Sequence, residues 1–332
     1  MDSLVGPHGI DRYLELIRPT LTVFDARARV VAVEHQTERT VTLTIDPNGA
    51  FTGFRAGQFV KVGVEIDGVR RTRTYSPTIS EYDVRLLELT ITVREGGVVG
   101  SYLRSHARPG MTLHLSDAAG SFVMPAERPD RVALVSGGSG VTPVIAMLRT
   151  LVSEGYTGQI DFIHYGRRAA DWLYKPAVEA IASAHPNVRV RYVATREGGE
   201  RFSAGTLSRD AQVFVCGPPE LIDAVRLEHP DAVAETFTPP TLDVSDEAAS
   251  GTVRFLRSDV SREIAPGTLL EQAEASGLSP EHGCRMGICH GCTCTKQAGA
   301  VKNVLTGEVS AEEYEEIRIC ISVPVGDVAL QL

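Results

Sequence analysis

Four cysteines near the C-terminus have a spacing that suits metal chemistry. Cys284, Cys289 and Cys292 follow one another as C-x4-C-x2-C, and Cys320 comes after a gap of twenty-seven residues. This spacing is typical of four thiolates that hold a [2Fe–2S] cluster. Such a cluster carries one electron at a time, so a chain that binds one must receive electrons from a donor and pass them to an acceptor.

The residues between these cysteines fit a tight loop around a cluster. Gly283, Gly287 and Gly291 allow the backbone to turn with positive φ, and loop amides can donate hydrogen bonds to sulfur. A zinc site and disulfides are the alternatives. Zinc sites usually pair two short C-x2–4-C knuckles, and Cys320 has no neighbouring cysteine with which to form one. Disulfides fit poorly with a chain without a secretory signal. Cys294 is expected to be a small apolar residue of the core and not a ligand.

Composition and charge narrow the class of protein. The chain has 332 residues, of which 43% are hydrophobic and 23% charged, as expected for two or three globular domains. Its formal net charge of −9 disfavours a nucleic-acid partner. No apolar run approaches the length that spans a bilayer, and six cysteines without a signal peptide predict a cytoplasmic protein.

The C-terminal part of the chain is acidic. From 251 to 332 we count eleven Asp and Glu against seven Lys and Arg, and the densest run is Glu312-Glu313-Tyr314-Glu315-Glu316. The plain interpretation of this run is a solvated helix face. The alternative is a surface that docks on a basic patch of an electron acceptor.

Periodicity divides the chain into five segments. A short apolar helical pattern within 1–22, closed by Pro19, predicts a docking helix or cap. Residues 23–127 read as an antiparallel β-barrel, and residues 128–236 alternate strands with helices, which predicts a parallel sheet. A proline-rich and acidic linker over 237–250 leads to the cluster domain at 251–332. The expected strands are 29–33, 41–45, 58–62, 89–93, 112–115, 131–135, 160–165, 188–193 and 212–216.

A glycine-rich turn, Ser136-Gly137-Gly138-Ser139-Gly140-Val141-Thr142-Pro143, lies between the first strand and first helix of the α/β segment. Glycines there let backbone amides approach a pyrophosphate, and the helix N-terminus favours negative charge. The spacing is not G-x-G-x-x-G, so a tight turn without function is the alternative.

Two further motifs carry polar groups to the same region. Cys216-Gly217-Pro218-Pro219 follows another strand, at the sheet edge where open α/β sheets bind ligands. Arg73-Thr74-Tyr75-Ser76-Pro77 follows a barrel strand and offers a cation for phosphate, an aromatic ring for stacking and a hydroxyl.

In this order (R-x-Y-S, a glycine-rich turn ending in T-P, C-G-P-P, then the cluster cysteines) the chain resembles the ferredoxin–NADP reductase-like flavoproteins, and among them the modular reductases with a C-terminal plant-type ferredoxin domain. The resemblance covers nearly the whole chain from about Ala26. It implies a flavin-binding β-barrel, an α/β nicotinamide-binding domain and an α+β ferredoxin domain of β-grasp type.

The resemblance also assigns the flavin site. Arg73 would bind a flavin phosphate with Thr74 beside it, Tyr75 would lie against the isoalloxazine, and Ser76 would act catalytically near flavin N5. Family members usually have G-x-x-S at the next turn, but here Gly100 stands where the serine is expected. That turn implies FAD and not FMN. The remaining expected flavin contacts are Thr92, Val93, Gly97, Val98, Val99, Gly100 and Ser101.

For the nicotinamide cofactor the resemblance implies a site that ends at Cys216, a catalytic residue where the nicotinamide meets the flavin. A buried cysteine at a strand end is the alternative for Cys216. Thr195-Arg196 resembles the element that grips the 2′-phosphate of NADPH, so we expect NADPH over NADH; an exposed arginine without this role is the alternative. The other expected contacts are Gly137, Gly138, Ser139, Gly140, Thr142, Pro143, Gly217 and Pro218, with Arg167 and Arg168 as weaker phosphate candidates.

The expected path is NAD(P)H to FAD, FAD to the [2Fe–2S] cluster and cluster to an oxygen-activating protein. The N-terminal text, the cluster loop and the ending Ile321–Val328 resemble reductases that serve membrane-bound di-iron fatty-acyl desaturases. Such a partner would bring this chain to a membrane surface. A ring-hydroxylating or other soluble oxygenase is the alternative acceptor, and a non-enzymatic iron–sulfur redox sensor is a third hypothesis.

Overall fold

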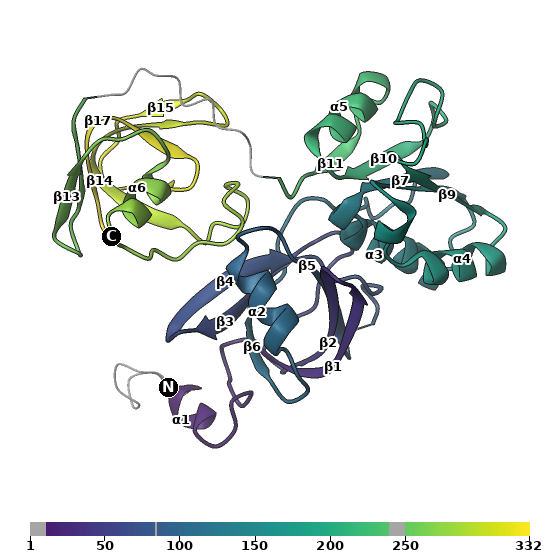
Figure 1. The fold of residues 1–332 in the computed structure, drawn as a ribbon, viewed down its shortest axis with the longest axis horizontal. Helices are drawn as coiled ribbons and strands as arrows, with labels where there is room; N and C mark the ends of the chain where they lie inside the picture. The colour runs from purple at the N-terminus through teal and green to yellow at the C-terminus, as the bar shows by residue number, and fades with distance from the viewer. Residues whose placement is uncertain (1–10, 84, 239–249) are drawn as a thin grey trace. The chain divides into compact units, whose positions relative to one another are not determined.

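The computed structural model describes residues 11–83, 85–238 and 250–332 (Figure 1). The chain divides into two compact units: the first comprises Met1–Arg70 and Thr74–Thr238, and the second comprises Pro239–Leu332 with Arg71–Arg73. The first unit contains an antiparallel sheet and a parallel sheet, and the second contains a mixed sheet. Most of the expected linker, 239–249, lies outside the described residues. Among the described helices, none has the length and apolar character needed to cross a membrane.

The antiparallel sheet has the strand order β4-β3-β6-β1-β2-β5. A bridge between Pro77 and Leu89, together with an amide hydrogen bond from Thr78 to the Glu88 carbonyl at 2.9 Å, joins the segment after β4 to β5 and closes the sheet into a barrel. Alternate apolar side chains fill its interior. The elements are β1 Arg27–Thr37, β2 Thr40–Pro47, β3 Val60–Ile66, β4 Val69–Tyr75, β5 Leu87–Thr92, α2 Val98–His106 and β6 Thr112–Leu115.

Strand β4 was not among the predicted strands. Arg73, Thr74 and Tyr75 are its last residues, so they lie in a strand and do not follow one. The sequence of β4 is polar, which hides it from a search for apolar alternation. The Asp67-Gly68 pair before it, with φ of 53° and 76°, forms the two-residue hairpin loop that joins β3 to β4, and this dipeptide is the signal that could have revealed the strand.

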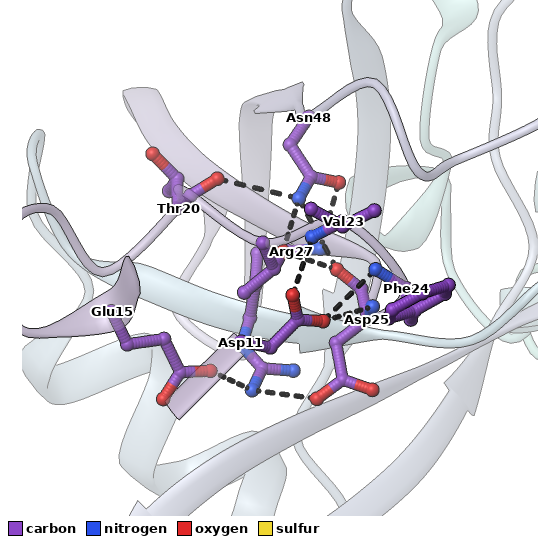
Figure 2. Close-up of polar contacts among 9 residues, drawn as sticks. Asp11, Glu15, Thr20, Val23, Phe24, Asp25, Arg27 and Asn48 are labelled. Carbon is purple, nitrogen blue, oxygen red and sulfur yellow. Dashed lines mark hydrogen bonds and ion pairs between the residues drawn. The ribbon is translucent and has the colours of Figure 1, made fainter. Parts of the chain in front are cut away.

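Polar contacts attach the N-terminal segment to the barrel (Figure 2). The Asp11 carboxylate accepts hydrogen bonds from the amides of Val23, Phe24 and Asp25 at 2.6, 2.9 and 3.0 Å. Burial opposes ionisation, but these three bonds and the nearby Arg27 hold the pKa of Asp11 below its usual value. Arg27, the first residue of β1, also pairs with Glu15. A buried charge therefore holds this segment where apolar packing was expected.

The expected helical cap is shorter than predicted. Helix α1 spans Asp11–Glu15, and residues 1–10 lie outside the described part. Leu16 and Ile17, which were expected on an apolar helix face, are 84% and 77% exposed. The break comes before Pro19, because the residue preceding a proline is biased away from helical geometry.

The parallel sheet has the order β11-β10-β7-β8-β9, with α3 and α4 covering one face and α5 the other. This is the doubly wound arrangement that alternating strands and helices predict, and the carboxyl ends of all strands meet at one edge. Strand β11 was not predicted. The elements are β7 Arg131–Gly137, α3 Val141–Ser153, β8 Gln159–Gly166, α4 Lys175–Ala184, β9 Val188–Ala194, β10 Gln212–Cys216, α5 Pro219–Glu228 and β11 Val233–Glu235.

The second unit is a mixed sheet in the order β13-β12-β17-β14-β15, with β16 also paired to β14. Only β12 and β17 run parallel among its pairs, and α6 packs its apolar side into the core. The predicted classes of all three domains are thus confirmed. The elements are β12 Thr252–Phe255, β13 Val260–Glu263, α6 Leu269–Ala275, β14 Thr293–Asn303, β15 Val309–Ser310, β16 Glu315–Arg318 and β17 Ser322–Leu330.

The acidic run 312–316 is not a helix face, so that interpretation was wrong. Tyr314 has φ of 55°, and Glu315 begins strand β16. A wholly buried lysine, Lys296, explains the difference. Its ammonium group donates to the carbonyls of Gly299 and Glu312 and pairs with the Glu315 carboxylate at 3.2 Å. These bonds tie the acidic run to β14 as a turn and a strand.

We predict that Lys296→Met destabilises the second unit by about 3 kcal/mol, near the lower end of the range for breaking a buried pair, because Glu315 keeps 29% side-chain exposure. Urea unfolding followed by circular dichroism measures the change. Lys302→Met, an exposed lysine on the same strand, is the control and should leave the midpoint unchanged. Equal midpoints for the two variants would contradict this role.

Candidate functional site

The first motif, Arg73–Pro77, begins in the last residues of β4 and ends at the bridge between Pro77 and Leu89 that closes the barrel. Ser76 directly follows β4, is 2% exposed, and its hydroxyl has no hydrogen-bond partner. A buried hydroxyl without a partner costs free energy, so this position fits a bound group that exchanges a hydrogen bond with it. Tyr75 packs half-buried against the barrel core. Both features suit a flat polar ring system such as the flavin.

The second expected flavin turn is the start of α2. Gly97 precedes the helix without a side-chain cap, and the first intrahelical bond runs from the Ser101 amide to the Gly97 carbonyl at 3.2 Å. The amides of Val98, Val99 and Gly100 therefore have no partner within the helix and can bind a phosphate. The Ser101 side chain is exposed.

Two other expected flavin contacts are partly engaged within the barrel. The Val93 amide donates to the Arg39 carbonyl at 2.8 Å, and the Val93 carbonyl accepts from the Arg39 guanidinium at 3.0 Å. The Thr92 hydroxyl lies 3.3 Å from that of Thr40. The backbone amide and carbonyl of Val93 are thus already bonded to Arg39. The roles of Thr92 and Val93 in cofactor binding stay predictions.

The glycine-rich turn and the C-G-P-P segment pack against each other. A Cβ on Gly140 would lie 2.1 Å from the Cys216 carbonyl oxygen, and one on Gly137 would lie 2.8 Å from the Pro218 ring. Gly140 thus allows α3 to begin close to the end of β10. Thr142 and Pro143 are buried, and the Thr142 hydroxyl donates to the Ser139 carbonyl at 3.1 Å. These two residues support the turn, which lies between the carboxyl end of β7 and the N-terminus of α3, a position that favours an anion.

Cys216 is wholly buried, in register with Ser136 on β7 and Glu235 on β11. Burial, and then the neighbouring Glu235, raise the pKa of the Cys216 thiol well above its usual value. Burial also raises the pKa of Glu235 to about 8, and its Oε2 has no hydrogen-bond partner. Burial thus favours the neutral form of both groups. In this conformation Cys216 packs as a buried strand-end cysteine, and its contact with a nicotinamide stays a prediction.

Glu235 was missed by sequence reasoning because its strand was missed. Three residues, V-A-E, before a proline pair are too short for a periodicity signal. Its place at the edge of the parallel sheet, beside Cys216, makes it a candidate member of the same site.

The arginine candidates for a 2′-phosphate lie on two adjacent strand ends. The Arg196 amide donates to the Arg167 carbonyl and the Thr195 amide to the Gly166 carbonyl, both at 2.9 Å, so the loops after β8 and β9 run together. The side chains of Arg167, Arg168 and Arg196 are exposed. Three guanidinium groups at one sheet edge suit a phosphate monoester.

The four cysteines of the C-x4-C-x2-C…C motif, all in the second unit, are arranged as two pairs. Cys284 and Cys289 hydrogen-bond each other through amide and sulfur at 3.2 and 3.3 Å. A hydrogen bond from the Cys320 thiol lowers the pKa of Cys292 to about 7, while the same bond raises that of Cys320. Among the described residues, no three His, Cys, Asp or Glu side chains form a site for a single metal ion. Two pairs of thiols suit two irons with two thiolates each.

Contacts on both sides of Cys284 hold the cluster loop. Arg285 has φ of 58°, and its guanidinium bonds both oxygens of Glu274 on α6, at 3.1 and 2.5 Å. The same guanidinium lies 3.0 Å from His282 Nε2. The loop amide of Met286 donates to the Cys284 sulfur at 3.3 Å. The loop thus has its amides directed at sulfur, as a cluster requires. Cys294 is buried in the core, as expected.

Comparison with known proteins places all three domains. Residues 28–124 match the FAD-binding domain of oxidoreductases, residues 134–227 the NAD-binding domain, and residues 255–325 the 2Fe-2S iron-sulfur cluster binding domain. The NADPH oxidoreductase of Mycobacterium tuberculosis is 30% identical, over 97% of this chain and 88% of its own length. The glycine betaine monooxygenase reductase subunit of Pseudomonas aeruginosa is 29% identical, over 83% and 87%.

Among solved structures, phthalate dioxygenase reductase superposes with a TM-score of 0.65 at 21% identity, covering 92% of this chain and 97% of its own. This similarity shows a shared fold. Together the matches establish an oxidoreductase with sites for FAD, a nicotinamide cofactor and a [2Fe–2S] cluster.

We predict that Gly100→Ser tightens FAD binding, because a Cβ there meets no atom closer than 3.7 Å and the hydroxyl can reach a phosphate. One net hydrogen bond is worth about 1 kcal/mol, or roughly fivefold in the dissociation constant. Flavin fluorescence on titration measures it. Gly97→Ser is the control, since its Cβ would lie 3.0 Å from the Arg94 carbonyl, and it should weaken binding. Weaker binding of FAD by Gly100→Ser would show that the turn does not face the phosphates.

Proposed function

This chain belongs to the ferredoxin–NADP reductase-like flavoproteins with a C-terminal [2Fe–2S] domain, and on that premise we propose that it is the reductase component of an oxygenase. It takes electrons from NAD(P)H and delivers them, one at a time, to a separate oxygenase protein. The observation that carries the proposal is that one chain contains two pairs of cysteines in an iron–sulfur domain, a barrel that matches FAD-binding domains and a parallel sheet that matches NAD-binding domains. The named similarity to a monooxygenase reductase subunit supports the type of acceptor.

The relatives named above do not support the expected desaturase partner. One is described as a monooxygenase reductase subunit and the other only as an NADPH oxidoreductase. The oxygenase alternative therefore becomes the proposal, and contact with a membrane-bound partner is not part of it. The sensor hypothesis is set aside because both oxidoreductase domains are matched.

The proposed roles follow from the geometry. When held by the residues described above, FAD would supply two-electron chemistry with a nicotinamide and one-electron chemistry with a [2Fe–2S] cluster. Ser76 offers its unpaired hydroxyl to the flavin, and the turn at Gly137–Gly140 holds the nucleotide pyrophosphate. Burial favours the neutral forms of Cys216 and Glu235 at the sheet edge, which lowers the charge beside the proposed nicotinamide site. The cluster cysteines form the exit.

We predict that Cys289→Ala leaves reduction of the flavin by NAD(P)H and of ferricyanide largely intact, because neither needs the cluster. Reduction of cytochrome c and of an oxygenase component should be lost. Stopped-flow absorption and steady-state assays measure these separately. Cys294→Ala is the matched control, since this buried cysteine belongs to the core, and it should retain the cluster and all activities. Full-rate reduction of the acceptor by Cys289→Ala would refute the proposed order of transfer.

The choice of nucleotide is tested at the exposed arginines. We propose NADPH and predict that Arg196→Ala raises the KM for NADPH by roughly tenfold or more, since a hydrogen bond to a charged group is worth about 1.5–3 kcal/mol, and leaves the KM for NADH nearly unchanged. Arg189→Ala, an exposed arginine earlier on β9, is the control. An equal effect on both nucleotides would place Arg196 outside the phosphate site.

The type of acceptor is tested by reconstitution. The purified chain, NADPH and an oxygenase component should show oxygen uptake that depends on the oxygenase substrate. A chain that supports a fatty-acyl desaturase in vesicles and no oxygenase would overturn the proposal and restore the desaturase hypothesis.

A further inference from the structure

A group of polar side chains joins the barrel to the parallel-sheet domain within the first unit, and none of the roles above uses it. Arg149 lies near the end of α3, and its Nη1 donates to the Thr78 carbonyl at 2.7 Å and to Glu88 Oε1 at 2.9 Å. Both acceptors belong to the barrel, where Thr78 follows Ser76 by two residues and Glu88 lies on β5. The guanidinium of Arg149 therefore binds both segments where the barrel closes, next to the proposed flavin motif.

Tyr174 contributes from the residue before α4. Its hydroxyl donates to Thr78 Oγ1 at 3.2 Å and contacts Thr90 Oγ1, while its ring centroid lies 5.3 Å from the Arg149 guanidinium carbon. The Thr78 hydroxyl in turn donates to Glu88 Oε1 at 2.6 Å. We call Thr78, Glu88, Thr90, Arg149 and Tyr174 the interdomain clasp.

The backbone of Tyr174 has φ of 61°, in the left-handed region. This conformation is unfavourable for a residue with a bulky side chain and persists only where the surrounding contacts require it. The contacts of the Tyr174 hydroxyl with Thr78 and Thr90 supply such a requirement. The strained residue thus points to a position that the fold must hold.

Helix α3 connects the clasp to the nucleotide turn. It begins at Val141, directly after Gly140, and carries Arg149 near its other end. A helix is a rigid element, so fixing Arg149 to Thr78 fixes the glycine turn relative to Ser76. We propose that Arg149 and Tyr174 are positioning residues that hold the nucleotide turn (Gly137–Gly140) and the flavin strip (Thr74–Ser76) at the separation that hydride transfer needs; this rests on the proposed assignment of the two sites.

The expected effect follows from the geometry of hydride transfer. Reacting atoms must approach to about 3–3.5 Å, and a misplacement of about 1 Å can cost roughly a hundredfold in rate. Arg149 and Glu88 are a partly exposed ion pair, and such pairs contribute little to stability. The clasp should therefore affect the rate of hydride transfer more than folding.

The test compares Arg149→Met, Arg149→Lys and Tyr174→Phe in the full-length, FAD- and cluster-loaded protein. Anaerobic stopped-flow should show flavin reduction at saturating NADPH slowed at least tenfold in Arg149→Met and about threefold in Tyr174→Phe. Arg149→Lys should recover part of the rate, because an ammonium group can still reach one acceptor. Dissociation constants for FAD and NADP⁺ should change less than twofold.

A readout independent of turnover is hydrogen–deuterium exchange of the 76–80 segment, which should become faster in Arg149→Met. Arg29→Met is the matched control, because Arg29 pairs with Asp46 on the barrel alone; it should change neither exchange there nor the rate. If Arg149→Met does not fold, Tyr174→Phe carries the test alone.

Clasp variants that lower thermal stability while flavin reduction keeps its wild-type rate would overturn the inference and leave a structural contact. Failure of the proposed function looks different: neither NADPH nor NADH would then reduce the flavin of the wild-type protein.

Discussion

Hydride transfer requires donor and acceptor atoms within about 3–3.5 Å of each other, and this requirement explains how the first unit is built. In the proposed assignment the flavin strip lies on a barrel and the nucleotide turn on a separate parallel sheet, so neither sheet alone can set the distance. Helix α3 starts at the nucleotide turn and reaches the barrel seam through Arg149. Close packing of Gly140 on the Cys216 carbonyl fixes where that helix starts. Small side chains and directional polar bonds thus define the site.

The second unit solves a different physical problem. Single electrons can cross longer gaps than a hydride, so this unit needs a stable, correctly charged cluster loop more than a close contact. Its loop is held locally, by the pairing of Arg285 with Glu274 and by amides directed at sulfur. The buried Lys296 keeps the acidic segment in a fixed conformation beside β14. Both features are formed by residues of this unit.

The sequence predicted the parts of the structure whose chemistry fixes residue type and spacing. The cluster cysteines, the glycine turn and the three domain classes are of this kind. Strand β4 and Glu235 were missed because a polar strand and a three-residue strand give no periodic signal. The clasp could not be found because Thr78 and Tyr174 are far apart in the chain and meet only after folding. The acidic run was misjudged because the buried Lys296, and not local propensity, decides its conformation. The electron acceptor is recognised through the protein surface, and short sequence motifs do not encode the shape of that surface.

The central claim is that electrons enter as a pair at the flavin and leave singly through the cluster. Mixing the oxidised protein with one equivalent of NADPH without oxygen, and freezing samples at intervals for electron paramagnetic resonance, tests it most directly. The account predicts that flavin absorption falls first and that the signal of the reduced [2Fe–2S] cluster grows afterwards. A cluster signal that appears before flavin reduction, or flavin reduction with no cluster signal at any time, would contradict it.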